Sequence, residues 1–331
     1  VPLSSANSSF SLVRLHIPSD DDKVTNVKKM RIVAVLQTAL LFTSLATLNA
    51  LGAPTADVPT APKISLVTRS LNSLSIFFDP KSSKDAKKYQ YTLDGGITWT
   101  NGVRRENSIF VSKVDPANRY QIALRGVNAR GVGQSSTTYG TKLALFVGAS
   151  ITAGSGGYGS GWVNQVGSRF NWQIANLATN NSGYGLPKLD SANCKIRLNF
   201  ASQLGCGLAF TPDIVFISGG LNDCGASSNT QSAGEDRVLQ TYQFAHDHYP
   251  NAIVVGTPVI TFATNNCLNQ LNSSIESATS QTSSHFISGA QAWLPGQTKW
   301  KNDSVHPNLV GHTFIARKII AWLIKQKLAL S

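Results

Sequence analysis

The sequence predicts an α/β fold with a doubly wound parallel sheet, preceded by a smaller all-β sandwich. Between residues 54 and 141, short runs of alternating or clustered apolar residues are separated by turn residues, a spacing typical of sandwiches. From residue 142 to residue 331, short apolar runs alternate with helical stretches, which is the pattern of parallel sheets covered by helices. A chain of 331 residues is long enough for two such domains and a leader.

Five runs are candidate strands of the sandwich. Turn signals such as Asp94-Gly95-Gly96 and Asn101-Gly102 separate some of them. The five runs span residues 62–67, 74–78, 89–93, 108–111 and 120–125.

The region of these five strands resembles a fibronectin type III domain, most closely over residues 115–131. One departure is that Phe77 or Phe78 stands where such domains usually have a Trp. The resemblance implies a spacer or a binding module. We expect a tether, and contact with carbohydrate or a cell surface through the sandwich is the alternative.

The α/β domain is predicted from three strands and two helices. The candidate strands are short apolar runs closed by turn residues, and the candidate helices have their apolar residues on one face. Buried parallel strands present the residues that follow them to a crevice, so we expect chemistry directly after these strands. The strands span residues 143–147, 213–218 and 252–258, and the helices span 162–170 and 309–328.

Three short segments supply the parts that acyl transfer needs. Ser150 follows the first strand of the α/β domain, and Asn222 follows the second in the turn Gly219-Gly220-Leu221-Asn222-Asp223. Near the C-terminus, Asp303 and His306 place a carboxylate and an imidazole three residues apart. A nucleophile, a base with an orienting acid and an amide donor for an oxyanion are the expected set.

Each of these residues is assigned a role. His306 accepts the proton of the Ser150 hydroxyl during attack, because an alcohol is a poor nucleophile without a base. Asp303 holds the imidazole tautomer and stabilises the imidazolium. The backbone N–H of Ser150 and the side chain of Asn222 donate to the oxyanion.

The segments Gly148-Ala149-Ser150, Gly220-Leu221-Asn222-Asp223 and Asp303-Ser304-Val305-His306 resemble the first, third and fifth blocks of the SGNH hydrolases, also called the GDSL esterase and lipase family. The resemblance spans residues 142–331. It implies a flavodoxin-like three-layer α/β/α domain that hydrolyses esters or related acyl bonds. It also implies that the enzyme uses no metal and no organic cofactor.

The sequence departs from the family pattern at two places. In relatives, an Asn is followed five residues later by the Gly whose N–H completes the oxyanion hole, whereas Asn176 is followed at that spacing by Asn181. Because a glycine is two residues further on, we expect Gly183 to be the third donor, with Asn181 as the alternative. The second departure is Ala149, at the position where the family name GDSL has Asp. In the family this Asp supports the turn, so its replacement concerns the local scaffold more than the nucleophile.

Simpler interpretations exist for each segment. Ser150 could be only a helix N-cap, Asp303 could cap the last helix, and His306 could be an ordinary loop residue. A Gly-x-Ser-x-Gly elbow is disfavoured because Thr152 occupies its last position. The other histidines lack the partners of a metal site and are expected to be surface or packing residues; they include His246, His248, His285 and His312.

The N-terminal part of the chain is expected to be a leader. Residues 1–29 are polar without periodicity, so they are expected to be disordered or not translated. Residues 30–53 have a basic start, an apolar core and a small-residue exit, which predicts a signal peptide and a secreted or extracytoplasmic protein. An uncleaved membrane anchor is the alternative, because the apolar core is near the lower limit for spanning.

All four cysteines lie in the α/β domain. An even number in a secreted chain indicates disulfides, and three connectivities are open. We favour Cys194 with Cys206 and Cys224 with Cys267.

The net charge is +12. A positive charge favours weak attraction to acidic polysaccharide, anionic lipid or cell wall. Nucleic-acid binding is not predicted, because no basic helix or base-stacking motif accompanies the charge.

Together these features predict a secreted serine ester hydrolase that acts through a Ser-His-Asp triad and an acyl-enzyme. A small-molecule or polysaccharide ester is the expected substrate, with carbohydrate or cell-wall O-deacetylation first, and the protein is expected to be a monomer. A lipase or lysophospholipase, an acyltransferase and an inactive surface-binding protein are the alternatives. Candidate pocket residues, each expected to pack more than to recognise, are Tyr158, Tyr184, Leu221 and Trp300.

Overall fold

A nine-stranded sheet forms the framework of the described residues. The computed structural model describes residues 58–185, 198–224 and 235–328, all within one compact unit. The predicted leader, residues 1–53, lies outside the described residues. In the part of the chain that the structure describes, no helix has the length and apolar character needed to cross a bilayer.

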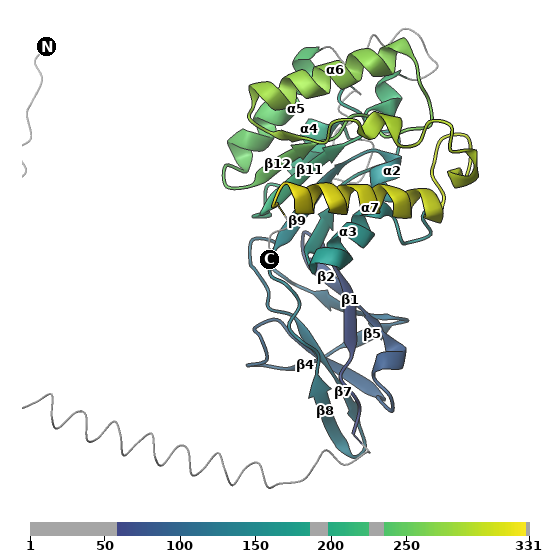
Figure 1. Cartoon of the computed structure of the whole chain (residues 1–331). Coiled ribbons are helices and arrows are strands. Elements are labelled where there is room, and N and C mark those ends of the chain that lie inside the picture. Colours follow the sequence, from purple (N-terminus) through teal and green to yellow (C-terminus); the bar gives the residue numbers. More distant parts are fainter. Residues whose placement is uncertain (1–57, 186–197, 225–234, 329–331) are drawn as a thin grey trace, which may run out of the picture. The chain divides into compact units, whose positions relative to one another are not determined.

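Five parallel strands form one half of this sheet, in the order β10-β9-β11-β12-β13 (Figure 1). Numbered along the chain this is 2-1-3-4-5, the strand order of flavodoxin-like folds. The predicted α/β fold with a parallel sheet is therefore confirmed. The strands are β9 (Leu143–Gly148), β10 (Gln173–Asn176), β11 (Ile214–Ser218), β12 (Ile253–Gly256) and β13 (His285–Phe286).

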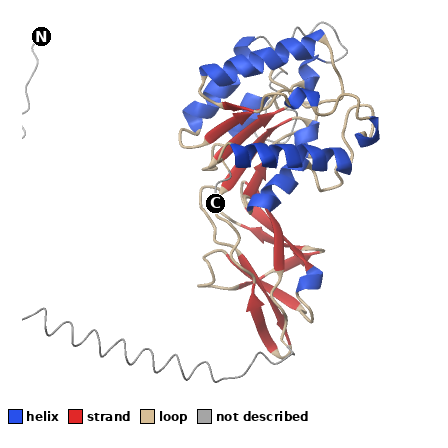
Figure 2. Cartoon of the chain, in the orientation of Figure 1, coloured by secondary structure: helices blue, strands red, loops and turns tan. Residues whose placement is uncertain are grey.

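Helices cover both faces of the parallel strands (Figure 2). Alternate residues of β9 point to opposite faces, so Leu145 and Phe146 belong to different cores. The core with Leu145 is closed by α4 (Phe200–Cys206), α5 (Glu235–His248) and α6 (Asn266–Gln281). The core with Phe146 is closed by α3 (Trp162–Phe170) and α7 (Leu309–Lys325). Both predicted helices are thus present, the first with the predicted ends.

The sheet continues beyond β10 into the N-terminal part of the chain. Strand β1 (Lys63–Ser70) pairs in parallel with β10, through Val67 with Gln173 and Thr68 with Ile174. The strands that follow pair antiparallel in the order β1-β2-β6-β5. They are β2 (Ser73–Asp79), β6 (Ser108–Ser112) and β5 (Val103–Arg105).

A second, antiparallel sheet packs on this N-terminal half, and the two share one buried core that includes Val67, Ile109 and Leu124. We call these strands and loops, residues 58–140, the β-module. Three of its strands, β4, β5 and β8, were not predicted, and its resemblance to a fibronectin type III domain stays a prediction. The strands of the second sheet, in order, are β4 (Thr100–Asn101), β3 (Lys88–Thr92), β7 (Ala123–Asn128) and β8 (Gly131–Ser135).

We expected a domain boundary between residues 141 and 142. In the structure, one continuous sheet and several polar contacts join the two sides of this boundary. Arg119 forms an ion pair with Asp213 and also donates to the carbonyl of Thr211 at 2.9 Å. Gln173 donates to the carbonyl of Tyr120 at 2.7 Å. The β-module is therefore attached to the parallel sheet by backbone pairing and by side chains.

Candidate active site

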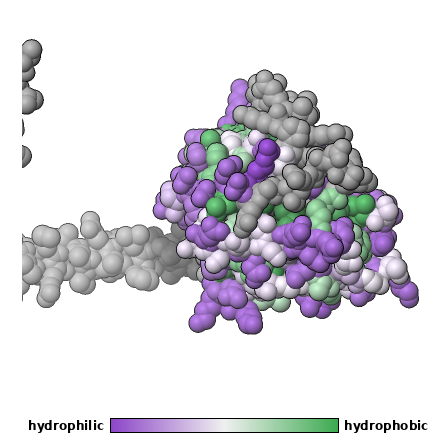
Figure 3. Space-filling view, turned by 90° about the horizontal axis from the view of Figure 1, so that it is seen from above, coloured by the Kyte–Doolittle hydropathy of each residue, from purple (hydrophilic) through white to green (hydrophobic). Residues whose placement is uncertain are grey.

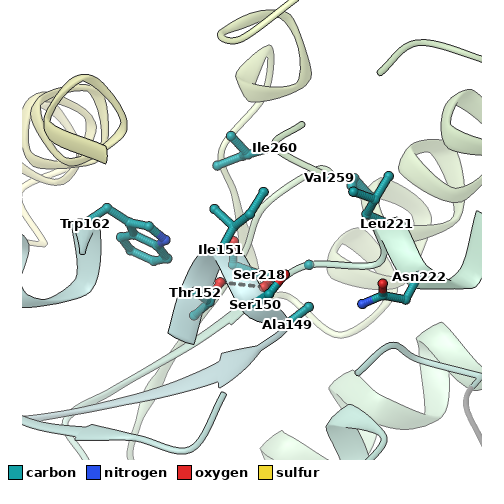
Figure 4. A pocket seen from close by; sticks show the side chains of 11 residues that line it. Ala149, Ser150, Ile151, Thr152, Trp162, Ser218, Leu221, Asn222, Val259 and Ile260 are labelled. Atoms are coloured by element: carbon teal, nitrogen blue, oxygen red, sulfur yellow. Dashed lines mark hydrogen bonds between the residues drawn. The ribbon is translucent and has the colours of Figure 1, made fainter. Parts of the chain in front are cut away.

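The candidate site lies where the strand order of the parallel sheet reverses. Strand β9 is followed on one side by β10 and on the other by β11, and open α/β sheets bind ligands at such a switch point. Ser150 begins the short helix α2 (Ser150–Ala153) directly after β9. Asn222 lies in the 3-10 turn η3 (Leu221–Cys224) after β11. Both side chains are in the same crevice (Figure 4).

The structure brings Ser150, His306 and Asp303 together. The Nε2 atom of His306 is 2.9 Å from Oγ of Ser150, and its Nδ1 atom is 2.8 Å from Oδ2 of Asp303. With a proton on Nδ1, the imidazole donates to Asp303 and accepts from the Ser150 hydroxyl. This is the hydrogen-bond order that a general base needs.

The loop before α7 sets the position of this imidazole. Oδ1 of Asp303 accepts the backbone N–H groups of Val305 and His306, at 2.8 and 2.7 Å. The backbone N–H of His306, its ring and the N–H of Val305 hold the pKa of Asp303 well below its usual range, so this carboxylate is charged at neutral pH. Asn308, and not Asp303, caps α7 by accepting the N–H of Gly311.

Two of the predicted oxyanion donors flank the Ser150 hydroxyl. The N–H of Ser150 is at the first position of a helix, where backbone donors have no partner within the helix. The side-chain amide of Asn222 donates one hydrogen to the carbonyl of Ser182 at 2.8 Å. Because an amide has two such hydrogens, the second remains for an oxyanion.

The two candidates for the third donor, Gly183 and Asn181, differ in packing and in backbone conformation. Gly183 is buried, and a Cβ there would lie 2.3 Å from Oδ2 of Asp223, so close packing requires the glycine. Asn181 is exposed with a φ of 59°, the left-handed conformation that a glycine adopts without strain. Asn181 therefore has a backbone conformation compatible with the family glycine, and both Gly183 and Asn181 stay candidates for the third donor.

Asp223 supports this turn, a role that the sequence analysis missed. Its carboxylate is buried and accepts the N–H groups of Tyr184 and Gly185 at 2.9 and 2.8 Å. Burial raises the pKa of Asp223, and these hydrogen bonds oppose the rise. The residue after it, Cys224, is bonded to Cys267 on α6.

The predicted disulfide between Cys224 and Cys267 is thus confirmed. It fixes the turn that carries Asn222 to a helix of the domain core. Cys206 is also disulfide-bonded. Its predicted partner, Cys194, lies outside the described residues, so that pairing stays a prediction.

His312 is a buried histidine that links the loop after α2 to α7. We call residues 154–161 the glycine-rich loop. The Nε2 atom of His312 lies 2.9 Å from the carbonyl of Ser155, and its Nδ1 atom accepts the N–H of Trp162 at 3.3 Å. Burial lowers the pKa of the His312 imidazole, so it is neutral. His312 is thus a buried packing residue whose two ring nitrogens both form hydrogen bonds with backbone groups.

A small apolar cavity adjoins Ser150 and Asn222 (Figure 4). Its volume is about 20 Å³. Of the four candidate pocket residues, Leu221 lines it, Tyr184 is buried, and Trp300 packs against Phe314 with ring centres 4.5 Å apart. The apolar side chains around the cavity are those of Ala149, Ile151, Trp162, Leu221, Val259 and Ile260.

Among residues 58–185, 198–224 and 235–328, no group of three or more His, Cys, Asp or Glu side chains could hold a metal ion.

The fold and the site define a class of hydrolase in which a serine lies at the switch point of an open α/β sheet. The sequence matches the GDSL-like Lipase/Acylhydrolase family over residues 146–314, just over half of the chain. The protein belongs to this family and is an enzyme that hydrolyses ester bonds. No curated protein matches the sequence.

Several solved structures are similar to the chain. An esterase, EstA, from Pseudoalteromonas sp. is 17% identical, with a TM-score of 0.46, covering 57% of this chain and all of its own. An acetyl xylan esterase from Butyrivibrio proteoclasticus is 12% identical, with a TM-score of 0.47, covering 83% of this chain and 98% of its own. A family two carbohydrate esterase from Clostridium thermocellum is 15% identical, with a TM-score of 0.45, covering 81% and 88%.

Proposed function

We propose that this protein is a secreted serine esterase that removes acetyl groups from carbohydrate or cell-wall esters. Its catalytic residues are Ser150, His306 and Asp303. The observation that carries the choice of acyl group is the size of the cavity beside Ser150. A small acyl group distinguishes the proposed esterase from a lipase or lysophospholipase, whose site must hold a long acyl chain.

The cavity suits a group as small as a methyl. A single water requires about 10–15 Å³ of such volume, and the cavity has about 20 Å³. Its walls are mostly apolar side chains, including Trp162, Val259 and Ile260 (Figure 4). An acyl group whose carbonyl carbon lies at Ser150 can therefore place one methyl in this cavity, whereas a longer chain requires these side chains to move.

The proposed reaction has two halves. In the first, Oγ of Ser150 attacks the ester carbonyl carbon while Nε2 of His306 takes the hydroxyl proton. The oxyanion accepts hydrogen bonds from the N–H of Ser150 and the amide of Asn222. When the tetrahedral intermediate collapses, the imidazolium gives its proton to the leaving alcohol, and an acyl-serine remains.

The second half releases the acid. His306 takes a proton from a water molecule, whose oxygen attacks the acyl-serine carbonyl. Collapse of this intermediate returns the proton to Oγ of Ser150 and frees the carboxylic acid. Asp303, held as a carboxylate by its hydrogen bonds, stabilises the imidazolium in both halves.

Secretion and a carbohydrate substrate are supported by separate features. The signal-peptide pattern in residues 30–53 and the Cys224–Cys267 disulfide both suit an oxidising, extracytoplasmic compartment. The net charge of +12 favours attraction to acidic polysaccharide. Hydrophilic residues cover much of the face of the enzyme seen in Figure 3.

The strand pairing supports a fibronectin type III-like β-module. One of its sheets has the order β1-β2-β6-β5 and the other β4-β3-β7-β8. Because β1 also pairs with β10, we propose that the module is a structural part of the enzyme instead of a flexible tether.

An ester series tests the proposal directly. The purified protein is assayed with nitrophenyl acetate, butyrate and octanoate, and with acetylated xylo-oligosaccharides. The expected result is a kcat/KM that falls steeply from acetate to octanoate, release of acetate from the oligosaccharides, and no turnover by Ser150→Ala. A preference for octanoate contradicts the acetyl assignment, and full activity of Ser150→Ala contradicts the mechanism.

A further inference from the structure

Tyr158 combines two unfavourable features. Its side chain is 83% exposed, although it is a large aromatic residue. Its backbone φ is 48°, in the left-handed region that residues with a bulky side chain rarely adopt. Strained backbone of this kind is found where the surrounding structure imposes it, often at binding sites. The position therefore requires an explanation beyond packing.

Hydrogen bonds place the Tyr158 ring beside the loop that carries the catalytic base. The Tyr158 hydroxyl donates to Oδ1 of Asn302 at 3.0 Å. The backbone N–H of Asn302 in turn donates to the carbonyl of His306 at 2.8 Å, and Asn302 directly precedes Asp303. The Tyr158 side chain thus contacts the segment that carries Asp303 and His306.

The glycine-rich loop that bears Tyr158 is also held in place. A Cβ on Gly156 would lie 2.2 Å from the carbonyl oxygen of Pro307 and 3.1 Å from Cβ of Asn302, so the two loops touch. The carbonyl of Ser155 is bound by the buried His312 ring. The backbone of the glycine-rich loop is consequently held against the loop that carries His306.

The position of the catalytic base limits where the leaving alcohol can lie. The acyl group enters the small cavity formed by Ile151, Trp162 and Ile260. The alcohol oxygen receives its proton from Nε2 of His306, so the rest of the alcohol extends past the imidazole. Asn302, which accepts the hydrogen bond of the exposed Tyr158 side chain, is bonded to the backbone of the same His306.

We infer that the Tyr158 ring is a platform on which a sugar ring of the substrate stacks, on the alcohol side of the ester. The C–H face of a pyranose is apolar, and a tyrosine ring offers a large, rigid contact surface with little loss of conformational entropy. This inference rests on the proposed carbohydrate esterase function and adds a residue that selects the alcohol portion.

A competing explanation is that Tyr158 is only a latch, with its hydroxyl bracing Asn302 and hence Asp303 and His306. The platform depends on the aromatic ring of Tyr158, whereas the latch depends on its hydroxyl. Tyr158→Phe removes the hydroxyl and keeps the ring, whereas Tyr158→Ala removes both. Ile97→Ala in the β-module is a matched control, because that side chain is 85% exposed and has no part in the site.

The test compares these variants on nitrophenyl acetate and on acetylated xylotriose, with the melting temperature of each variant measured alongside. For Tyr158→Ala we expect KM for acetylated xylotriose to rise about tenfold, the loss of one aromatic stacking contact, with a smaller effect on nitrophenyl acetate. Tyr158→Phe is expected to keep most of the affinity for acetylated xylotriose.

Four outcomes overturn the inference. Equal losses on both substrates in Tyr158→Ala, or a Tyr158→Phe variant as impaired as Tyr158→Ala, would assign the residue to the latch. An unchanged KM for acetylated xylotriose in Tyr158→Ala would show that Tyr158 is not a platform and would leave the proposed esterase function standing. If the wild-type enzyme cleaves nitrophenyl acetate but no acetylated oligosaccharide, the proposed substrate class fails, and the platform fails with it.

Discussion

The side-chain amide of Gln203 binds both backbone polar groups of Gly148. Its Oε1 accepts the N–H of Gly148 at 2.8 Å, and its Nε2 donates to the carbonyl at 2.9 Å. Gly148 ends β9, two residues before Ser150, and Gln203 is fully buried on α4. Because Ala149 has no polar side chain to support the nucleophile turn, this amide pair is a principal polar attachment of the strand end.

Replacing Gln203 with Leu removes that attachment. The N–H and carbonyl of Gly148 would lose a buried partner, so we expect the free energy of unfolding to fall by about 1–3 kcal/mol. A displaced Ser150 would also lower kcat, by about tenfold or more. Urea unfolding and steady-state kinetics measure the two effects. Gln281→Leu, at an exposed position on α6, is the control and should change neither; a Gln203→Leu enzyme with normal kcat would show that the turn does not depend on this amide.

His312 should make the stability of the enzyme depend on pH. In the unfolded chain its imidazole takes a proton below its ordinary pKa of 6.5, whereas burial lowers the pKa in the folded state. The unfolded state then binds more protons, so the free energy of unfolding should fall as the pH is lowered from about 7 to about 5. His312→Gln is expected to be less stable at neutral pH and to show a shallower fall. Urea unfolding across this range tests it, and equal slopes for the two proteins would contradict the assignment.

Asn222 is expected to act in the transition state. Removing one oxyanion donor typically lowers the rate about 10²–10³-fold, so Asn222→Ala should lose kcat by that order with little change in KM. Asn269→Ala, on the exposed side of α6, is the control. Because Asn222 also donates to the carbonyl of Ser182, the melting temperature should be recorded. Unchanged kcat in a folded Asn222→Ala protein would show that Asn222 does not donate to the oxyanion.

The β-module should be required for the stability of the hydrolase. Without it, β10 loses its pairing with β1 and becomes an edge strand, and Asp213 loses Arg119. We therefore expect a protein of residues 142–331 to be less soluble and to unfold at lower urea concentration than one of residues 54–331. Equal solubility and equal unfolding midpoints would instead favour an independent module.

Local patterns predicted a large part of the fold. The run ending at Gly148 and the helix from Trp162 to Phe170 were predicted because burial and periodicity are visible in a few consecutive residues. Ser150, Asp303 and His306 were found together because their segments have recognisable spacing, and the structure places their side chains in contact.

Other features depend on contacts between distant parts of the chain. The pairing of β1 with β10 was not predicted, since a strand pattern does not specify its partner. Gln203 and His312 are polar residues on amphipathic helices, and only the folded structure shows that both side chains are buried against backbone groups. The left-handed backbone at Asn181 is likewise invisible in the sequence, because asparagine adopts either conformation.

Covalent labelling tests the central claim that His306 makes Ser150 nucleophilic. The enzyme is treated with diethyl nitrophenyl phosphate, which transfers a diethylphosphoryl group to an activated serine with loss of nitrophenolate, and the adduct is located by peptide mass spectrometry. The predicted result is a single adduct on Ser150 that is absent in Ser150→Ala and strongly reduced in His306→Ala. An adduct on another residue, or labelling of Ser150 that is as fast in His306→Ala as in the wild type, would contradict it.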